Sequence, residues 1–191
     1  MEKFFHEGYQ IKIEQDIDSE SPRDCDNLGT MICFHKKYNL GDKHKYDPSN
    51  YVGWAELEED IKQQEDAAII LPLSLYDHGG ITMSVGSPSQ FPDAHWDAGY
   101  VGFIVVSKEK VKEEYGNLSQ KSLETAERVL RGEVETYDQY LTGDVWQYAI
   151  EDGNGEVVDS CCGFFGHDEA EKEAKRSAEY LAETVKNCEK E

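Results

Sequence analysis

The sequence predicts an α+β fold, a mostly antiparallel sheet with three to four helices packed on one side. Residues 67–107 combine the longest apolar runs with a turn at Asp77–Gly80, which is typical of a hairpin. Apolar residues recur at helical spacing over residues 119–141 and 168–188. Neither a βαβ rhythm nor a glycine-rich phosphate loop is present. At 191 residues the chain can bury a core, and we expect a single domain over residues 1–191.

Seven strands are expected in chain order. Alternating apolar residues indicate the first, and YVGFIVV at Tyr100–Val106, apolar on both faces, indicates a strand between two layers. Pro72 indicates that its strand starts late or lies at an edge, because proline cannot donate to a ladder. The predicted strands are Tyr9–Glu14, Thr30–His35, Ala68–Tyr76, Ile81–Val85, Tyr100–Val106, Val145–Ile150 and Glu156–Ser160.

Four helices are expected from periodicity and capping signals. Ser107 and Gly116 are a suitable N-cap and C-cap for a short helix, and Ser49 could cap an earlier one. The predicted helices are Asn50–Gln64, Ser107–Tyr115, Ser119–Leu141 and Asp168–Cys188, the first with Trp54, Leu57 and Ile61 on its inner face.

The charge is strongly acidic and unevenly distributed. Nineteen Lys and Arg against forty Asp and Glu give a net charge of −21, which disfavours direct binding to nucleic acid or to an anionic membrane. Six acids lie in Glu14–Asp26 and six in Glu56–Asp66, whereas Lys36–Lys45 is locally basic. Such a surface attracts a cationic partner, although an acidic excess also serves solubility alone.

Cysteine usage and hydropathy point to the cytoplasm. Five cysteines without a CxxC pair favour reduced thiols. No apolar run approaches the roughly 18 residues that a membrane span requires. We therefore expect a cytoplasmic protein.

The sharpest candidate for chemistry is Asp77-His78 at the predicted hairpin tip. His78 could act as a general base or metal ligand with Asp97 or His95 from the following loop, and with His35. Turn chemistry alone also accounts for Asp and Gly at these positions.

Metal sites are weakly signalled elsewhere. Asp16, Asp18, Asp24 and Asp26 have the oxygen chemistry of a calcium or magnesium site, but their order does not match an EF-hand loop. Cys25, Cys33, His35 and His44 lack the spacing of zinc ligands. No cofactor is expected other than such a divalent cation.

Several stretches together resemble a family of uncharacterised bacteriophage and mobile-element proteins. The resemblance implies a bacterial host cytoplasm and no particular activity. It also implies tryptophan as the usual residue where Cys25 and Cys162 stand here. The stretches are SPRDCDNLGTM at Ser21–Met31, YNLGD at Tyr38–Asp42, LYDHGGITM at Leu75–Met83, DAGYVGFI at Asp97–Ile104, YLTGDV at Tyr140–Val145 and DSC at Asp159–Cys161.

Two main functions follow as hypotheses. The first is an interaction protein that antagonises a host defence or nucleic-acid-binding protein, its carboxylates mimicking phosphates in the partner's basic groove. The candidate partner-binding acids are Glu14, Asp16, Asp18, Glu20, Asp24, Asp26, Glu56, Glu58, Glu59 and Asp60. The alternative is a metal-dependent hydrolase of a nucleotide or signalling molecule that uses Asp77, His78, Asp97 and His35. A third is a structural or regulatory protein that binds one small ligand.

Overall fold

The computed structural model describes residues 1–91 and 94–188, except for the side chains of residues 94, 95 and 188. Its contacts group the chain into two compact units, Met1–Ser21 with Gln139–Glu191, and Pro22–Asp138. The predicted α+β class with antiparallel pairing is confirmed. The strands form two four-stranded sheets where the sequence suggested one, and the single domain over residues 1–191 stays a prediction.

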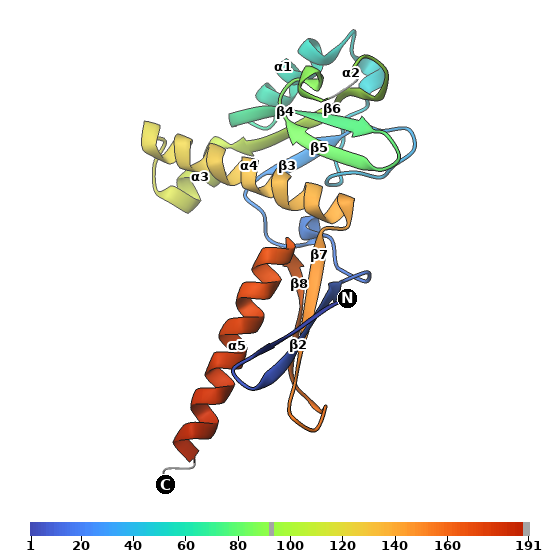
Figure 1. Cartoon of the computed structure of the whole chain (residues 1–191). Coiled ribbons are helices and arrows are strands. Elements are labelled where there is room, and N and C mark those ends of the chain that lie inside the picture. The colour runs from blue at the N-terminus through green and yellow to red at the C-terminus, as the bar shows by residue number, and fades with distance from the viewer. Residues whose placement is uncertain (92–93, 189–191) are drawn as a thin grey trace. The chain divides into compact units, whose positions relative to one another are not determined.

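The unit of residues 22–138 is built on a sheet of order β3-β6-β4-β5 (Figure 1). All of its neighbouring strands are antiparallel. Its strands are β3 (Thr30–Cys33), β4 (Ala67–Asp77), β5 (Ile81–Val85) and β6 (Ala98–Ser107). The predicted hairpin is present, because β4 pairs with β5. The predicted central strand is also present, because β6 lies between β3 and β4.

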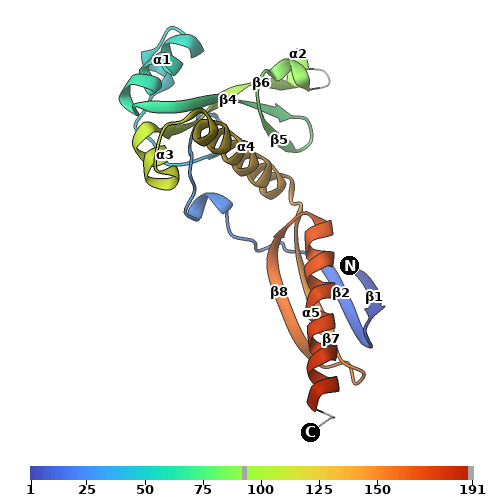
Figure 2. The same cartoon turned by 90° about the vertical axis from the view of Figure 1, so that its left-hand side faces the viewer.

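Helices cover both faces of this sheet, as Figure 2 shows for α1 and α4. Leu57 and Ile61 of α1 (Trp54–Gln64) pack with Phe103 and Val105. Ile104 lies on the opposite face because side chains alternate along a strand. There it adjoins Gly29, whose added Cβ would lie 2.5 Å from Leu130 of α4 and 2.8 Å from Ile104. The sequence placed all helices on one side, but a strand that is apolar on both faces needs cover on each.

The remaining helices of this unit are short. They are α2 (Ala94–Asp97), α3 (Lys108–Tyr115) and the 3-10 turns Pro22–Asp24, Pro48–Asn50 and Pro88–Gln90. α3 begins as predicted, with the Ser107 hydroxyl accepting from the Lys110 amide, and ends at Gly116 in the left-handed region. α4 (Gln120–Thr142) belongs to this unit as far as Asp138.

Pro72 lies at the position in β4 where pairing with β5 ends and that side of the strand becomes an edge of the sheet. β4 pairs with β5 only from Leu73 to Asp77, while it pairs with β6 from Ala67 onwards. The Pro72 carbonyl accepts from the Gly86 amide at 2.9 Å, so its ring nitrogen faces the same side, just beyond the end of β5. The missing donor leaves the Gly86 carbonyl without a bond from Pro72, and the Ser74 hydroxyl donates to that carbonyl at 2.6 Å instead.

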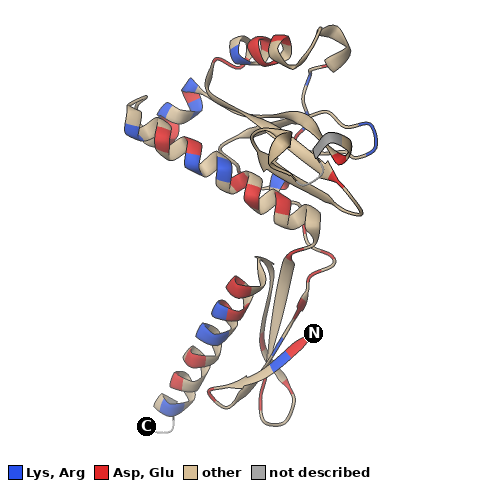
Figure 3. Ribbon diagram, turned by 45° about the horizontal axis from the view of Figure 1, so that its top comes forward, with Lys and Arg blue, Asp and Glu red and all other residues tan. Residues whose placement is uncertain are grey.

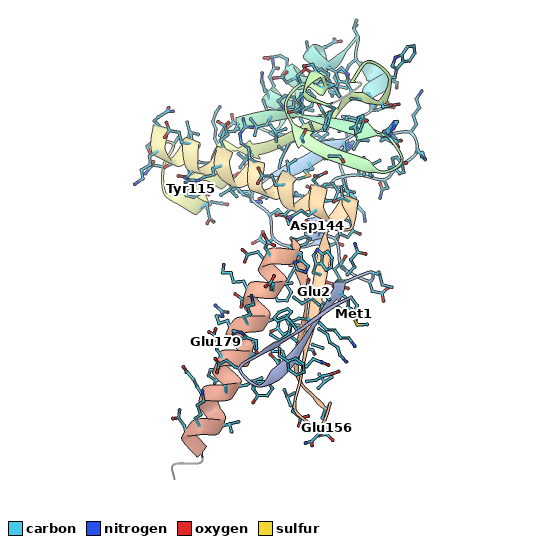
Figure 4. All side chains as sticks on the ribbon, viewed as in Figure 1. Met1, Glu2, Tyr115, Asp144, Glu156 and Glu179 are labelled. Carbon is cyan, nitrogen blue, oxygen red and sulfur yellow. The ribbon has the colours of Figure 1, made fainter. Side chains whose placement is uncertain are left out.

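The unit of residues 1–21 and 139–191 has a sheet of order β1-β2-β7-β8 with α5 on one face. Ile11, Ile13 and Ile150 pack against alanines 170, 174 and 178 of α5, which lets the helix approach the sheet closely. Glu179 of α5, labelled in Figure 4, lies 3.1 Å from His6 of β1. The elements are β1 (Glu2–His6), β2 (Tyr9–Gln15), β7 (Val145–Glu151), β8 (Val157–Phe165) and α5 (His167–Cys188).

The first strand, β1, was not predicted. Its sequence EKFFH does not alternate, and Phe5 is 75% exposed, so pairing with β2 rather than burial defines it. No helix within the described ranges is long and apolar enough to cross a membrane.

Candidate functional site

The structure brings two of the four proposed catalytic residues into contact. Nδ1 of His78 lies 2.9 Å from Oδ2 of Asp97, at the tip of the β4–β5 hairpin. The His78 side chain is 68% exposed and its ring stacks on Tyr76. Asp77 instead faces Lys37, whose Nζ lies 3.9 Å away. This is an exposed pair, without the enclosure that strengthens catalytic electrostatics.

His35 does not join the His78–Asp97 pair through any described contact. Its Nδ1 accepts from the amides of Lys37 and Tyr38, and its ring stacks on Tyr38. The side chain of His95 lies outside the described residues. Within the described chain, the one group with metal-binding geometry is His167, Asp168 and Glu171 at the start of α5, where none of the predicted ligands lies.

The six acids of Glu14–Asp26 have few partners of any kind within the described chain. Among the described residues none of these six carboxylates forms an ion pair. Glu14 accepts from Gln147, and Asp16 accepts from the Gly163 amide. The other four, Asp18, Glu20, Asp24 and Asp26, are exposed and have neither a hydrogen-bond partner nor an ion-pair partner in the described chain.

The four predicted acids of α1 are already occupied. Glu58 pairs with Lys62 at 2.6 Å, and Glu59 accepts from Gln63. Glu56 accepts from the Val52 amide, and Asp60 accepts from the Tyr51 hydroxyl. Acidic and basic residues likewise alternate along α4 and α5 (Figure 3). Of the ten predicted partner-binding acids, Glu58 alone is paired with a cation of the described residues, and five accept hydrogen bonds from uncharged groups. The remaining four are the partnerless acids Asp18, Glu20, Asp24 and Asp26.

A pocket of about 640 Å³ lies between β3 and α1, wholly within the unit of residues 22–138. The connection that follows β3 forms most of its wall, and Trp54 comes from the start of α1. The pocket is lined by basic and aromatic side chains and by five other residues. The first group is Phe34, His35, Lys36, Tyr38, Lys43, His44 and Trp54, and the second is Cys33, Asn39, Leu40, Asp42 and Pro48.

The base of this pocket is anchored to the rest of its unit. The Asp42 carboxylate accepts from the Arg23 guanidinium at 2.6 Å and from the Met31 amide at 2.7 Å. Gly41 has a φ of +68°, and its amide donates to the Tyr137 hydroxyl at 3.0 Å. These bonds make the connection an ordered wall, because every one of them ends on a strand, a helix or the Arg23 turn.

The pocket combines free cations with aromatic rings. Lys36 and Lys43 make no ion pair with a described residue. Phe34 contacts His44 edge-to-face at 4.8 Å between ring centroids, and Trp54 lies 6.2 Å from Phe34. Such a set can hold an anion against a ring-lined wall.

Two buried polar groups, Nδ1 of His44 and the Cys33 thiol, lie at the pocket. His44 Nε2 lies 2.9 Å from the Cys33 carbonyl, so this nitrogen carries the donated hydrogen, and the buried Nδ1 has no partner in the described chain. Burial raises the pKa of the Cys33 thiol to about 12, with a further contribution from the Asp42 charge. The thiol is therefore neutral and unreactive near pH 7.

Sequence reasoning detected only part of this pocket. The locally basic Lys36–Lys45 was visible, and Trp54 was placed on the inner face of its helix. Nothing in the spacing indicated that Trp54 and His44 would meet around one cavity, since that contact depends on how α1 packs on the sheet.

Comparisons of this chain with protein-family models, with curated proteins and with solved structures find no match. The resemblance to phage and mobile-element proteins accordingly stays a prediction.

Proposed function

We propose that this chain is an acidic interaction protein of phage or mobile-element type that acts in the bacterial host cytoplasm. Its role would be anti-defence, in which carboxylates imitate the phosphates of DNA and occupy the basic groove of a host nucleic-acid-binding protein. Its binding is a protein–protein interaction, and we propose neither direct nucleic-acid binding nor membrane binding. The observation that carries the proposal is the set of exposed, unpaired carboxylates at Asp18, Glu20, Asp24 and Asp26.

Unpaired carboxylates are suited to a cationic partner for an energetic reason. An acid already paired with lysine must give up that pair before it can bind a new one, so its net gain is small. The four free acids lose only hydration. They are therefore the primary contacts in this proposal, and Glu58, which pairs with Lys62, is the weakest candidate. The intermediate candidates accept hydrogen bonds from uncharged groups, and they are Glu14, Asp16, Glu56, Glu59 and Asp60. Attraction of this kind weakens with added salt.

The test neutralises the four free acids and compares them with four others. One variant carries Asp18→Asn, Glu20→Gln, Asp24→Asn and Asp26→Asn. The control carries Glu109→Gln, Glu113→Gln, Glu114→Gln and Glu135→Gln, which are exposed, unpaired in the described chain and equal in charge change. Each full-length protein is immobilised and exposed to bacterial lysate at low salt, and bound proteins are identified by mass spectrometry.

We expect the unaltered chain and the control to capture the same nucleic-acid-binding protein and the first variant to lose it. Added duplex DNA should displace that partner, because both would occupy one groove. Capture that is equal for both variants, or that duplex DNA does not affect, would contradict the proposal. So would recovery of no nucleic-acid-binding protein at all.

The contact between His78 and Asp97 favours the metal-dependent hydrolase as a second candidate. A carboxylate at Nδ1 orients an imidazole, as in metal-ligating or general-base histidines. The purified chain would be incubated with Mn²⁺ and a panel of nucleotides. Release of product that His78→Ala abolishes supports this function, and turnover that is absent or unchanged in His78→Ala rejects it.

A further inference from the structure

We infer that the pocket between β3 and α1 binds a small anion that carries a planar ring, the chemistry of a nucleoside monophosphate. This inference concerns a different surface from the acidic segment and does not depend on the proposed function. It rests on the local charge, the aromatic wall and the anchoring of the pocket.

The local charge is the first step. In a chain of net charge −21, most cations in the described helices pair with nearby acids, as Lys62, Arg131 and Lys175 do. Lys36 and Lys43, in the connection that follows β3, make no such pair with a described residue, and both line one pocket.

The carboxylate nearest to these lysines along the chain does not cancel them. Asp42 also lines the pocket, but its oxygens accept from Arg23 and from the Met31 amide. The neighbouring Lys45 is occupied by Glu65 at 3.4 Å. Lys36 and Lys43 therefore keep their charge for a ligand, and an anionic group gains charge-assisted hydrogen bonds from them.

The aromatic residues supply the second half of the site. Phe34, Trp54 and the stacked pair of His35 and Tyr38 all line the cavity. Trp54 is 37% exposed, which leaves part of its ring surface available. Stacking on an aromatic side chain favours the binding of a base in nucleic-acid-binding proteins. A volume of about 640 Å³ falls in the range of small-molecule sites.

The site is formed before any ligand arrives, and it binds rather than reacts. The Arg23–Asp42 pair and the Gly41–Tyr137 hydrogen bond hold the wall in place, so little ordering is needed on binding. The Cys33 thiol stays protonated and offers no nucleophile. The buried Nδ1 of His44 has no hydrogen-bond partner in the described chain, and a ligand group that hydrogen-bonded to it would recover the cost of its burial.

The experiment is isothermal titration of the purified full chain with AMP, GMP, CMP, UMP, adenosine and inorganic phosphate. Lys36→Ala/Lys43→Ala removes both free lysines of the pocket. Lys112→Ala/Lys121→Ala is the matched control, because these lysines are also unpaired, lie in the same unit and are remote from the lining. Trp54→Ala tests the ring contact separately, and circular dichroism verifies that each variant is folded.

We expect AMP to bind the unaltered chain and the control equally, and the pocket lysine variant to bind it at least about tenfold more weakly. Adenosine and phosphate should each bind at least about tenfold more weakly than AMP, since each lacks one half of the ligand. Trp54→Ala should weaken AMP and leave phosphate unchanged.

Three results would overturn the inference. One is absence of binding by AMP, GMP, CMP and UMP up to about 10 mM. A second is equal AMP affinity in the pocket lysine variant and the control. The third is phosphate binding as tightly as AMP with no effect of Trp54→Ala, which would leave a simple anion site without ring recognition.

Discussion

Nη2 of Arg23 lies 2.6 Å from Oδ2 of Asp42, and Nη1 of the same guanidinium lies 3.1 Å from Oε2 of Glu133. The Arg23 side chain is only 5% exposed. Burial by itself lowers its pKa, but the two carboxylates outweigh burial and the pKa is raised overall. The contact joins the turn before β3, the wall of the pocket and α4 into one buried network.

Replacing Arg23 should destabilise the unit of residues 22–138 strongly. Arg23→Ala leaves Asp42 and Glu133 without their cation in a partly buried site, and we expect a loss of about 3–5 kcal/mol in the free energy of unfolding. The control Arg128→Ala, at an exposed position of α4, should change it by less than about 0.5 kcal/mol. Urea denaturation measures both, and similar losses for the two variants would disprove the structural role of this network.

Gly41→Ala should be costly for two separable reasons. A Cβ there would lie 2.6 Å from the Met31 carbonyl oxygen, and the φ of +68° is strained for alanine. Gly116→Ala has a similar φ of +78° with nothing within 4 Å, so it reports the backbone strain alone, about 1–2 kcal/mol. We expect Gly41→Ala to lower the free energy of unfolding clearly more than Gly116→Ala does, as measured by thermal or urea unfolding. Equal losses of unfolding free energy in the two variants would mean that the connection after β3 shifts to make room for the methyl group without an energetic cost.

Asp138→Asn should alter how stability depends on pH. Burial raises the pKa of the Asp138 carboxyl above its ordinary 3.8, and the hydrogen bond from the Met83 amide opposes this only in part. The folded state thus holds this proton to higher pH than the unfolded state, and its contribution to stability falls as pH rises above 3.8.

Asn keeps an acceptor for Met83 and does not titrate. We therefore expect the stability of the unaltered chain relative to Asp138→Asn to decrease between about pH 4 and pH 7. Urea unfolding at these two pH values measures the difference. A difference that stays constant or increases with pH would contradict the assignment.

The described cysteines should differ sharply in reactivity. Cys33 is 7% exposed and its pKa is raised to about 12 by burial, whereas Cys25, Cys161 and Cys162 are exposed. Brief treatment of the native chain with iodoacetamide at pH 8, followed by peptide mapping, should modify those three and spare Cys33. The same treatment in urea should modify Cys33 as well. Rapid native labelling of Cys33 would show that the pocket opens.

Local patterns predicted most elements because the signals are local. The start of α1 was wrong, since the helix begins at Trp54 after Gly53 and not at Asn50 after Ser49. Ser107 and Gly116 bound α3 as expected, and Asp77–Gly80 turns β4 into β5, since caps and tight turns depend on a few neighbouring residues. The division of strands between two sheets was not predictable in this way. Val145–Glu151 pairs with Tyr9–Gln15 across more than a hundred residues, and no local pattern records such a choice of partner.

The candidate sites, like the fold, could be predicted only in part from the sequence. His78 and Asp97 were named together from their residue types, and they meet at 2.9 Å, but their exposure could not be read from the chain. The acids of Glu14–Asp26 and of α1 looked alike in sequence. Only side-chain placement separated the unpaired carboxylates from those bound to Lys62 or Tyr51.

The sequence by itself determined the charge, the antiparallel α+β character and the positions of most helices and turns, because composition, periodicity and capping act over short stretches. Only the tertiary structure decided which strands share a sheet and that helices cover both faces of one of them. It also decided that Arg23 would neutralise Asp42 and leave Lys36 and Lys43 unpaired on a pocket. These outcomes depend on which distant surfaces exclude water from one another, and that is settled when the whole chain packs.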